Sequence, residues 1–237
     1  MARPKALLLK FPGTNCDVET ARALDQVGFE SSVQPISVVD PDELAKQQLL
    51  VFSGGFSYGD YVMAGRLAQL EIERRLGTAI QDFYANGGSL LGICNGFQIL
   101  TKLGILPEGS LIENRSGRFV CRWTGLEKQS SNNAFLQNLP DQFELPVAHA
   151  EGRMVTPSAE SAEEHFAKGH VALTYSENFN GSERAIAGLQ DEAGRVLGLM
   201  PHPERFTDRR HHYDPDWNGA EHGWGRYLFE SIYQNLS

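Results

Sequence analysis

Short apolar runs alternate with amphipathic stretches in the first part of the chain. Residues 6–9, 49–52 and 89–93 are continuous apolar runs, which is the pattern of strands covered on both faces. Residues 17–27 follow the first run with apolar positions at helical spacing, and residues 95–103 follow the third run in the same way. Strands separated by helices favour a parallel sheet with helices on both faces, so we predict an α/β fold with ligands at the carboxyl ends of the strands.

After about residue 117 the apolar runs are shorter and lie closer together. This spacing favours added antiparallel strands in the C-terminal half, at residues 118–123, 143–149, 171–175, 185–189 and 195–199. The polar residues 127–138 and the charged residues 158–168 are interpreted as loops or a surface helix, because neither has the composition of a domain linker. We therefore expect residues 1–237 to form a single domain.

The composition narrows the class of protein. Hydrophobic residues make up 41% and charged residues 22% of the 237 residues, which is typical of a folded globular domain. The formal net charge of -9 argues against nucleic acid as a partner, because binding to its phosphates requires clustered Lys and Arg. No apolar run approaches the roughly 20 residues that span a bilayer, so no membrane is expected. The 3 cysteines, without an export signal, favour the reducing cytoplasm over a disulfide framework.

Cys94 is the candidate nucleophile. It lies in Gly92-Ile93-Cys94-Asn95-Gly96, where an apolar strand turns into a helix with a glycine two residues away on either side. Such a sharp turn lifts the side chain above the sheet and faces it toward the positive end of the following helix, which favours the reactive thiolate. The alternative is a buried structural cysteine, and this is our interpretation of Cys16 and Cys121, which lack that setting.

His202 is the candidate base for this nucleophile. Pro201 and Pro203 each favour extended geometry in the residue before them, so His202 is expected to continue the direction of the preceding strand. In an extended segment Glu204 points the same way as His202, and its carboxylate can orient the imidazole. Cys94, His202 and Glu204 then form a catalytic triad; the alternative is a proline-rich surface loop.

These residues resemble the class I glutamine amidotransferases, whose Cys, His and Glu triad occurs in this chain order with a Gly-x-Cys-x-Gly turn. Over residues 5–206 the chain is similar to one branch of that family, the glutaminase subunits of phosphoribosylformylglycinamidine synthase. The similarity rests on the motifs at residues 54–61, 92–98, 148–152, 180–182 and 200–205. The resemblance implies a flavodoxin-like fold and the hydrolysis of glutamine to glutamate and ammonia for purine biosynthesis.

The resemblance also implies roles for further residues. Backbone N–H groups of Asn95 and of Gly55 or Phe56 would hold the oxyanion of the tetrahedral intermediate. Contacts with the glutamine substrate are implied for Gln98, His149, Glu151 and Asn180. For His149 and Glu151 a structural role is equally open, and Asn180 by itself indicates only a turn. No metal site is expected: residues 209–224 contain histidines without a recognisable ligand spacing, and we assign this stretch no role.

The chain is expected to need partners. It has no Gly-x-x-x-x-Gly-Lys-Ser/Thr loop, so we expect no cofactor in this chain, with ATP and magnesium on a separate synthetase. The resemblance implies such a synthetase subunit, which aminates formylglycinamide ribonucleotide, and a small bridging subunit. Three alternatives stay open: a cysteine peptidase, a γ-glutamyl hydrolase of similar fold, or a catalytically silent docking subunit.

Overall fold

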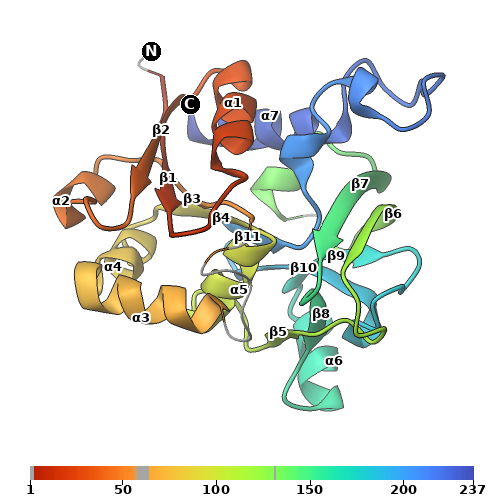
Figure 1. The fold of residues 1–237 in the computed structure, drawn as a ribbon, viewed down its shortest axis with the longest axis horizontal. Coiled ribbons are helices and arrows are strands. Elements are labelled where there is room, and N and C mark those ends of the chain that lie inside the picture. The colour runs from red at the N-terminus through yellow and green to blue at the C-terminus, as the bar shows by residue number, and fades with distance from the viewer. Residues whose placement is uncertain (1–2, 56, 58–63, 131) are drawn as a thin grey trace.

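The computed structural model describes residues 3–55, 57, 64–130 and 132–237. Within these residues nine strands form one mixed sheet in the order β2-β1-β3-β4-β11-β10-β9-β6-β7, and two more form a small separate sheet (Figure 1). The large sheet contains β1 (Lys5–Lys10), β2 (Glu30–Pro35), β3 (Leu49–Phe52), β4 (Ser89–Ile93), β6 (Val120–Lys128), β7 (Gln142–His149), β9 (Val171–Tyr175), β10 (Ile186–Gln190) and β11 (Val196–Leu199). The small sheet pairs β5 (Ser110–Ile112) with β8 (Arg153–Val155).

The predicted parallel sheet is present, and β2 and β11 make it two strands wider than the three expected. β2, β1, β3, β4 and β11 pair in parallel in that order, and the side chains of β3 and β4 are buried throughout. The prediction for β11 was wrong in part. This strand is antiparallel to β10 but parallel to β4, because the chain returns to the middle of the sheet after building the C-terminal strands.

The added antiparallel strands are also present. β10, β9, β6 and β7 extend the sheet by antiparallel pairing, as expected for the C-terminal half. β6 runs to Lys128, beyond the predicted end at residue 123, because its whole length pairs with β7. The charged residues predicted as a loop or surface helix form a helix at residues 159–167.

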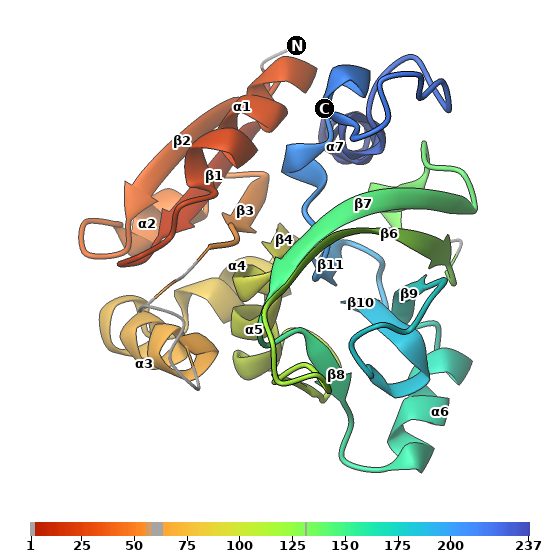
Figure 2. The ribbon, with the colours of Figure 1, turned by 45° about the vertical axis from the view of Figure 1, so that its right-hand side comes forward.

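Helices cover both faces of the parallel strands, and Figure 2 shows them in two groups. α1 packs on β1 and β2 and against α7, whereas α5 packs on β3, β4 and β11 and against α3. The sequence pattern did not indicate α7. The helices are α1 (Asp17–Val27), α2 (Pro41–Leu44), α3 (Ala64–Leu76), α4 (Ala79–Ala85), α5 (Asn95–Lys102), α6 (Ala159–Ala167) and α7 (Trp224–Leu236).

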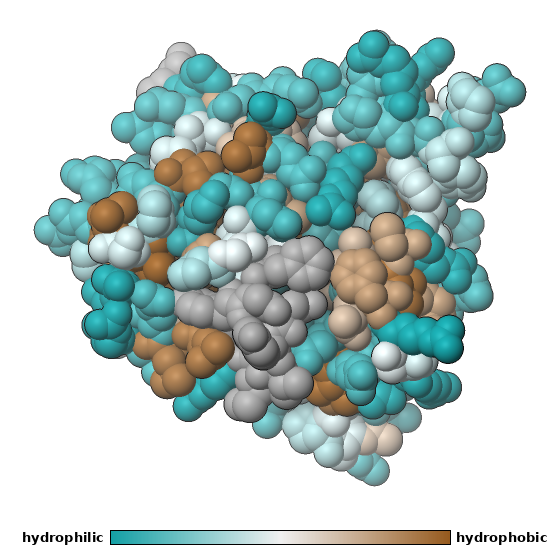
Figure 3. Space-filling model, viewed as in Figure 1, coloured by the Kyte–Doolittle hydropathy of each residue, from teal (hydrophilic) through white to brown (hydrophobic). Residues whose placement is uncertain are grey.

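Among the described residues, no helix combines the length and apolar character that crossing a bilayer requires. On the face shown in Figure 3, hydrophobic groups are small and separated by hydrophilic residues.

Three neighbouring parallel strands end at the same edge of the sheet. β3 ends before Gly54 and Gly55, β4 ends before Cys94, and β11 ends three residues before His202. The carboxyl ends of parallel strands are where ligands of such folds bind. The fold therefore brings the motifs identified in the sequence to one place.

Candidate active site

Cys94 occupies a sharp turn between β4 and α5. Its φ of 52° and ψ of -107° are unusual for a residue with a side chain, and such a conformation costs about 1–3 kcal/mol. The Cys94 N–H donates to the Leu199 carbonyl oxygen of β11 at 2.7 Å, which ties the turn to the neighbouring strand. The strained turn predicted from the flanking glycines is therefore present.

Close packing explains why glycines flank this turn. A β-carbon on Gly96 would lie 1.8 Å from the Phe52 carbonyl oxygen, and one on Gly92 would lie 2.7 Å from the Gly96 carbonyl oxygen. Both neighbours are backbone atoms of packed elements, so they cannot turn aside as a flexible side chain could. The glycines are needed for the approach of α5 to β3 and β4.

Replacing Gly96 with Ala is therefore expected to destabilise the protein by about 4 kcal/mol or more, because α5 must move away from β3. Urea unfolding followed by circular dichroism measures this loss. Gly77→Ala is a matched control, since Gly77 has a φ of +56° but no atom within 4 Å of its would-be β-carbon. That variant should lose only about 1–2 kcal/mol from backbone strain. Equal losses in the two variants would contradict the packing argument.

His202 and Glu204 form a buried pair beside the turn. His202 Nδ1–H donates to Glu204 Oε1 at 2.6 Å, and the two side chains are 2% and 0% exposed. The predicted contact is present, but the predicted extended geometry was wrong beyond His202. Residues Pro203–Arg205 form a 3-10 turn, since proline at the first position of a helical turn has a suitable φ and needs no hydrogen-bond acceptor. The turn brings Glu204 back to the imidazole.

The electrostatic surroundings favour the charged form of His202. Burial alone lowers the pKa of this imidazole, but the Glu204 carboxylate and the Cys94 sulfur outweigh burial and hold the pKa well above its usual value of 6.5. The raised pKa favours the imidazolium form of His202. An imidazolium beside a sulfur nucleophile is ready to protonate a leaving group.

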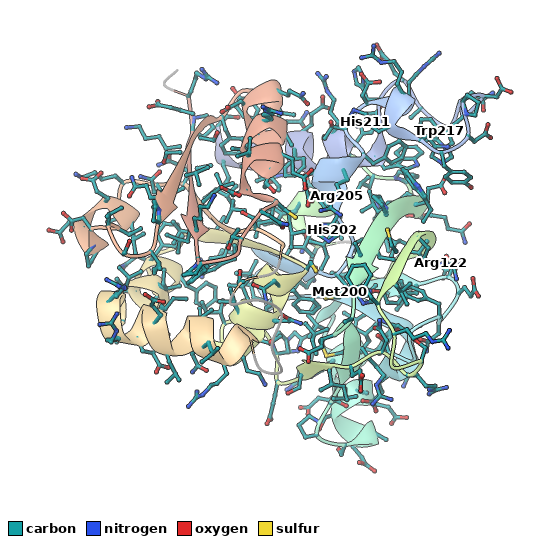
Figure 4. All side chains as sticks on the ribbon, viewed as in Figure 1. Arg122, Met200, His202, Arg205, His211 and Trp217 are labelled. Carbon is teal, nitrogen blue, oxygen red and sulfur yellow. The ribbon has the colours of Figure 1, made fainter. Side chains whose placement is uncertain are left out.

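A pocket of about 230 Å³ opens at this edge of the sheet. Cys94 and His202 both line it, and both pack against Gly54. A β-carbon on Gly54 would lie 2.8 Å from His202 Cε1 and 3.3 Å from Cys94 Cβ. Figure 4 shows His202 and Arg205 near the middle of the molecule, between its parallel and antiparallel halves. The other predicted site residues that line the pocket are Gly55, Asn95, Gln98, His149 and Glu151.

The residues predicted for the oxyanion hole lie on either side of Cys94. Asn95 is the first residue of α5, where a backbone N–H has no acceptor within the helix. Gly55 has a φ of 125°, and a β-carbon there would lie 2.4 Å from Asn15 Oδ1, so only glycine fits. Phe56 lies outside the described residues.

Residues 148–151 form one wall of the pocket, and side-chain and backbone amides hold the carbonyl groups of its last three residues and of Gly152, which follows them. Asn114 donates through Nδ2 to the carbonyl of His149 at 2.8 Å and through its backbone N–H to that of Ala150 at 2.8 Å. Gln98 Nε2 donates to the Glu151 carbonyl, and Asn180 Nδ2 donates to the Gly152 carbonyl, each at 2.8 Å. These four hydrogen bonds hold the backbone of the wall in place.

Two predicted substrate contacts thus acquire a second role. Gln98 lines the pocket, but its amide also joins α5 to the wall and accepts from Asn95 Nδ2 at 2.8 Å. Asn180 is fully buried and, in the part of the chain that the structure describes, does not line the pocket. Asn114, which holds more of the wall than either, was not identified from the sequence.

Cys16 and Arg205 were also not identified as site residues. Cys16 precedes α1, is 1% exposed and lines the pocket, although the sequence indicated only a structural cysteine. Arg205 places Nη2 3.1 Å from Cys16 Sγ and Nε 3.1 Å from Glu19 Oε1. No sequence signal marks these contacts, because they join the segment before α1 to the turn after β11.

One group of described residues has metal-ligand chemistry. Potential ligand atoms of Cys16, His202 and Glu204 all lie within 4.8 Å of one another. Glu204 is already hydrogen-bonded to His202, however, and the guanidinium of Arg205 already lies against the Cys16 sulfur. A cation there would have to displace both contacts, and we assign no metal to these residues.

The stretch at residues 209–224 packs over the antiparallel strands. Its His212 is buried, lies against the rings of Trp123 and Trp217, and places Nε2 3.1 Å from Glu144 Oε1. Figure 4 shows Trp217 in the outer part of the molecule, away from His202. These contacts give the stretch a packing role.

Comparison with known proteins identifies the family. Residues 3–235 match the CobB/CobQ-like glutamine amidotransferase domain. The chain belongs to this family of glutamine amidotransferases. The amidotransferase is 41% identical to phosphoribosylformylglycinamidine synthase subunit PurQ of Dehalococcoides mccartyi, over 92% of this chain and 90% of that protein. It is 37% identical to subunit PurQ of Thermotoga maritima, over 99% of each chain.

Solved structures agree with this assignment. The amidotransferase matches a chain of the structure of PurLQS from Thermotoga maritima with a TM-score of 0.81 and 34% identity, over 100% of both chains. The glutaminase domain of CTPS from Trypanosoma brucei, with bound acivicin, has the same fold, with a TM-score of 0.63 and 11% identity. The family resemblance and fold class expected from the sequence are confirmed.

Proposed function

We propose that this chain is the glutaminase subunit of a phosphoribosylformylglycinamidine synthase. It hydrolyses glutamine to glutamate and ammonia and passes the ammonia to a synthetase subunit. The observation that carries the proposal is the meeting of a strained cysteine with a buried imidazolium–carboxylate pair at the carboxyl ends of β4 and β11. The similarity over nearly the whole chain to curated PurQ subunits supports the choice of pathway.

The reaction starts when the Cys94 sulfur attacks the carboxamide carbon of glutamine and forms a carbon–sulfur bond. The negative charge on the amide oxygen is held by backbone N–H groups near Asn95 and Gly55. When the carbon–nitrogen bond breaks, the His202 imidazolium supplies the proton that lets the nitrogen leave as neutral ammonia. A γ-glutamyl thioester on Cys94 and a neutral imidazole on His202 remain.

Water completes the cycle. Neutral His202 removes a proton from water, whose oxygen attacks the thioester, and the carbon–sulfur bond breaks to release glutamate. Glu204 keeps the imidazole in one orientation and stabilises its charged form in both steps. The Glu151 carboxylate, which lines the pocket, is suited to the α-ammonium group of the substrate, and Asn180 acts indirectly by holding Gly152.

The ammonia must reach its acceptor without entering bulk water, where at neutral pH it would become non-nucleophilic ammonium. We therefore propose docking of an ATP- and magnesium-dependent synthetase over the pocket, with a small bridging subunit. Phe119 supports this arrangement, since it lines the pocket and remains 48% exposed. The matched structure from Thermotoga maritima is a PurLQS structure.

Two further points complete the proposal. We take residues 1–237 as a single amidotransferase domain, because the nine-stranded sheet takes its strands from most of the chain's length. We also propose a cytoplasmic location, where the thiol nucleophile stays reduced.

Labelling with a glutamine-like diazo ketone tests the proposal. The reagent should alkylate Cys94 in the protein, and peptide mass mapping should find the adduct there and not on Cys121, which is exposed in the same pocket. Excess glutamine should protect Cys94. Cleavage of casein would indicate a peptidase, and failure to label Cys94 would indicate a silent docking subunit.

A further inference from the structure

The ring of His149 is held in one tautomer by Asn114. Asn114 Nδ2 lies 2.8 Å from the His149 carbonyl oxygen and 3.0 Å from the Arg118 carbonyl oxygen. Since both neighbours only accept hydrogen bonds, the NH₂ end of the amide must face them and Oδ1 must face the other way. The Gly152 N–H, which points at Oδ1 from 3.4 Å, supports this orientation.

This orientation fixes the proton on the imidazole. His149 Nδ1 lies 3.0 Å from Asn114 Oδ1, and an oxygen that only accepts requires Nδ1 to carry the hydrogen. In the neutral ring Nε2 then has a free lone pair. Burial, followed by the nearby His202 imidazolium, lowers the pKa of His149 to about 4, so the ring is neutral at physiological pH.

The free nitrogen has no partner in the described part of the chain. His149 is 4% exposed, and its Nε2 is a buried polar atom without a hydrogen bond. A β-carbon on Gly152 would lie 2.2 Å from Nδ1, so only glycine at this position leaves space for the ring, and the hydrogen bond of Nδ1 to Asn114 holds the orientation of the ring. A buried acceptor without a donor costs about 1–3 kcal/mol, and a ligand that supplies the donor recovers this cost.

We propose that His149 Nε2 accepts a hydrogen bond from the carboxamide N–H of the substrate, and that Asn114 is the positioning residue that keeps this nitrogen unprotonated. The inference rests on the proposed glutaminase function and assigns the contact that recognises an amide leaving group. His149 lines the same pocket as Cys94 and follows Ala148, whose carbonyl oxygen lies 3.9 Å from Cys94 Sγ.

Charge also favours the carboxamide over the α-ammonium group. A neutral imidazole suits a neutral amide N–H, whereas the ammonium group is better matched by the carboxylate of Glu151, which lines the same pocket. Because its pKa is about 4, His149 neither protonates the leaving nitrogen nor takes a proton from it. The proton comes from His202, and the nitrogen leaves as neutral ammonia.

The test compares two substrates that differ in this donor. L-glutamine has a carboxamide N–H, and L-glutamate γ-methyl ester has none. In His149→Phe the kcat/KM for glutamine should fall about 10–100-fold more than that for the ester, because only glutamine loses a hydrogen bond. Asn114→Ala should produce a similar selective loss, and the double variant should add little to it.

Asn180→Ala is the matched control. Asn180 holds the same wall through Gly152 but makes no hydrogen bond to the imidazole. The variant should therefore lower the kcat/KM for both substrates equally. A long-range proton–nitrogen NMR spectrum of the wild type should show His149 as the Nδ1–H tautomer, and Asn114→Ala should lose this preference. This readout does not depend on activity.

Each result bears on one hypothesis. An Nε2–H tautomer in the wild type, or equal losses for the two substrates in His149→Phe, overturns the role of His149 while leaving the glutaminase in place. If the wild type in the complex hydrolyses neither substrate, the proposed function itself fails. A selective loss of kcat/KM for glutamine in His149→Phe, together with the Nδ1–H tautomer in the wild type, supports the inference.

Discussion

Cys94→Ala should abolish glutamine-dependent amination while amination from added ammonium salt survives. The rate with glutamine is expected to fall at least about 10,000-fold, because the remaining hydrogen bonds of the pocket can bind glutamine but cannot form a thioester. The ammonium-dependent rate should persist, since that reaction takes place on the synthetase. The measurement uses the complex reconstituted with its synthetase subunit, with each nitrogen source supplied separately.

Cys121→Ala is the control for this experiment. Cys121 lines the same pocket and is exposed, but it lies on β6 without the strained backbone of Cys94. Its removal should leave glutamine use within about twofold of the wild type, a bound set by the small effect of most exposed substitutions. If Cys94→Ala still used glutamine, another group would be the nucleophile. If both nitrogen sources failed, the synthetase in the reconstituted complex would itself be inactive.

The turn that holds Cys94 could be predicted because its signals are local. An apolar strand, a cysteine and a glycine on either side of it are adjacent in the sequence, and each has a steric reason. The need for glycine at position 96 could not be predicted from the adjacent sequence, because the atom that excludes a β-carbon is the carbonyl oxygen of Phe52 on another strand.

The contact between His202 and Glu204 was predicted correctly from an incorrect backbone. The sequence argument extended the strand through Pro203, whereas the structure turns there. A proline restricts the residue before it to extended geometry, and His202 does have a φ of -106° and a ψ of 88°. The φ of Pro203 itself also suits the first position of a helical turn. The effect of Pro203 on the residues after it therefore decides the geometry.

The supporting residues could not be predicted because they act across the fold. Asn114 precedes β6, yet it holds the end of β7, and Cys16 meets the side chain of Arg205 from the far side of the sheet edge. Their neighbours are 35 and 189 positions away in the chain. The spacing of residues around either position does not predict such contacts, because the order of the strands in the sheet creates them.

Glu204→Gln should reduce glutamine-dependent kcat by roughly 1,000- to 10,000-fold, as removing the carboxylate of such a triad does elsewhere. Glutamine keeps the size of the side chain but lacks its charge, so the imidazolium of His202 loses its main stabilising neighbour. The pKa of His202, which Glu204 and Cys94 hold well above 6.5 against the effect of burial, should fall. The decline of activity toward alkaline pH should therefore begin at a lower pH, which a pH–rate profile measures.

The loss of stability in Glu204→Gln, relative to the wild type, should also depend on pH. A pKa that is higher in the folded protein than in the unfolded chain contributes stability that is fully present below the unfolded value, near 6.5, and is lost as the pH rises through the folded value. The melting temperature of Glu204→Gln should therefore lie furthest below that of the wild type at neutral and mildly acidic pH, and the gap should narrow in alkaline buffer. Glu19→Gln is the control, because it removes a carboxylate that contacts Arg205 and not His202. A constant gap across pH would mean that Glu204 does not stabilise a charged imidazole and that His202 meets the leaving nitrogen without a proton to give.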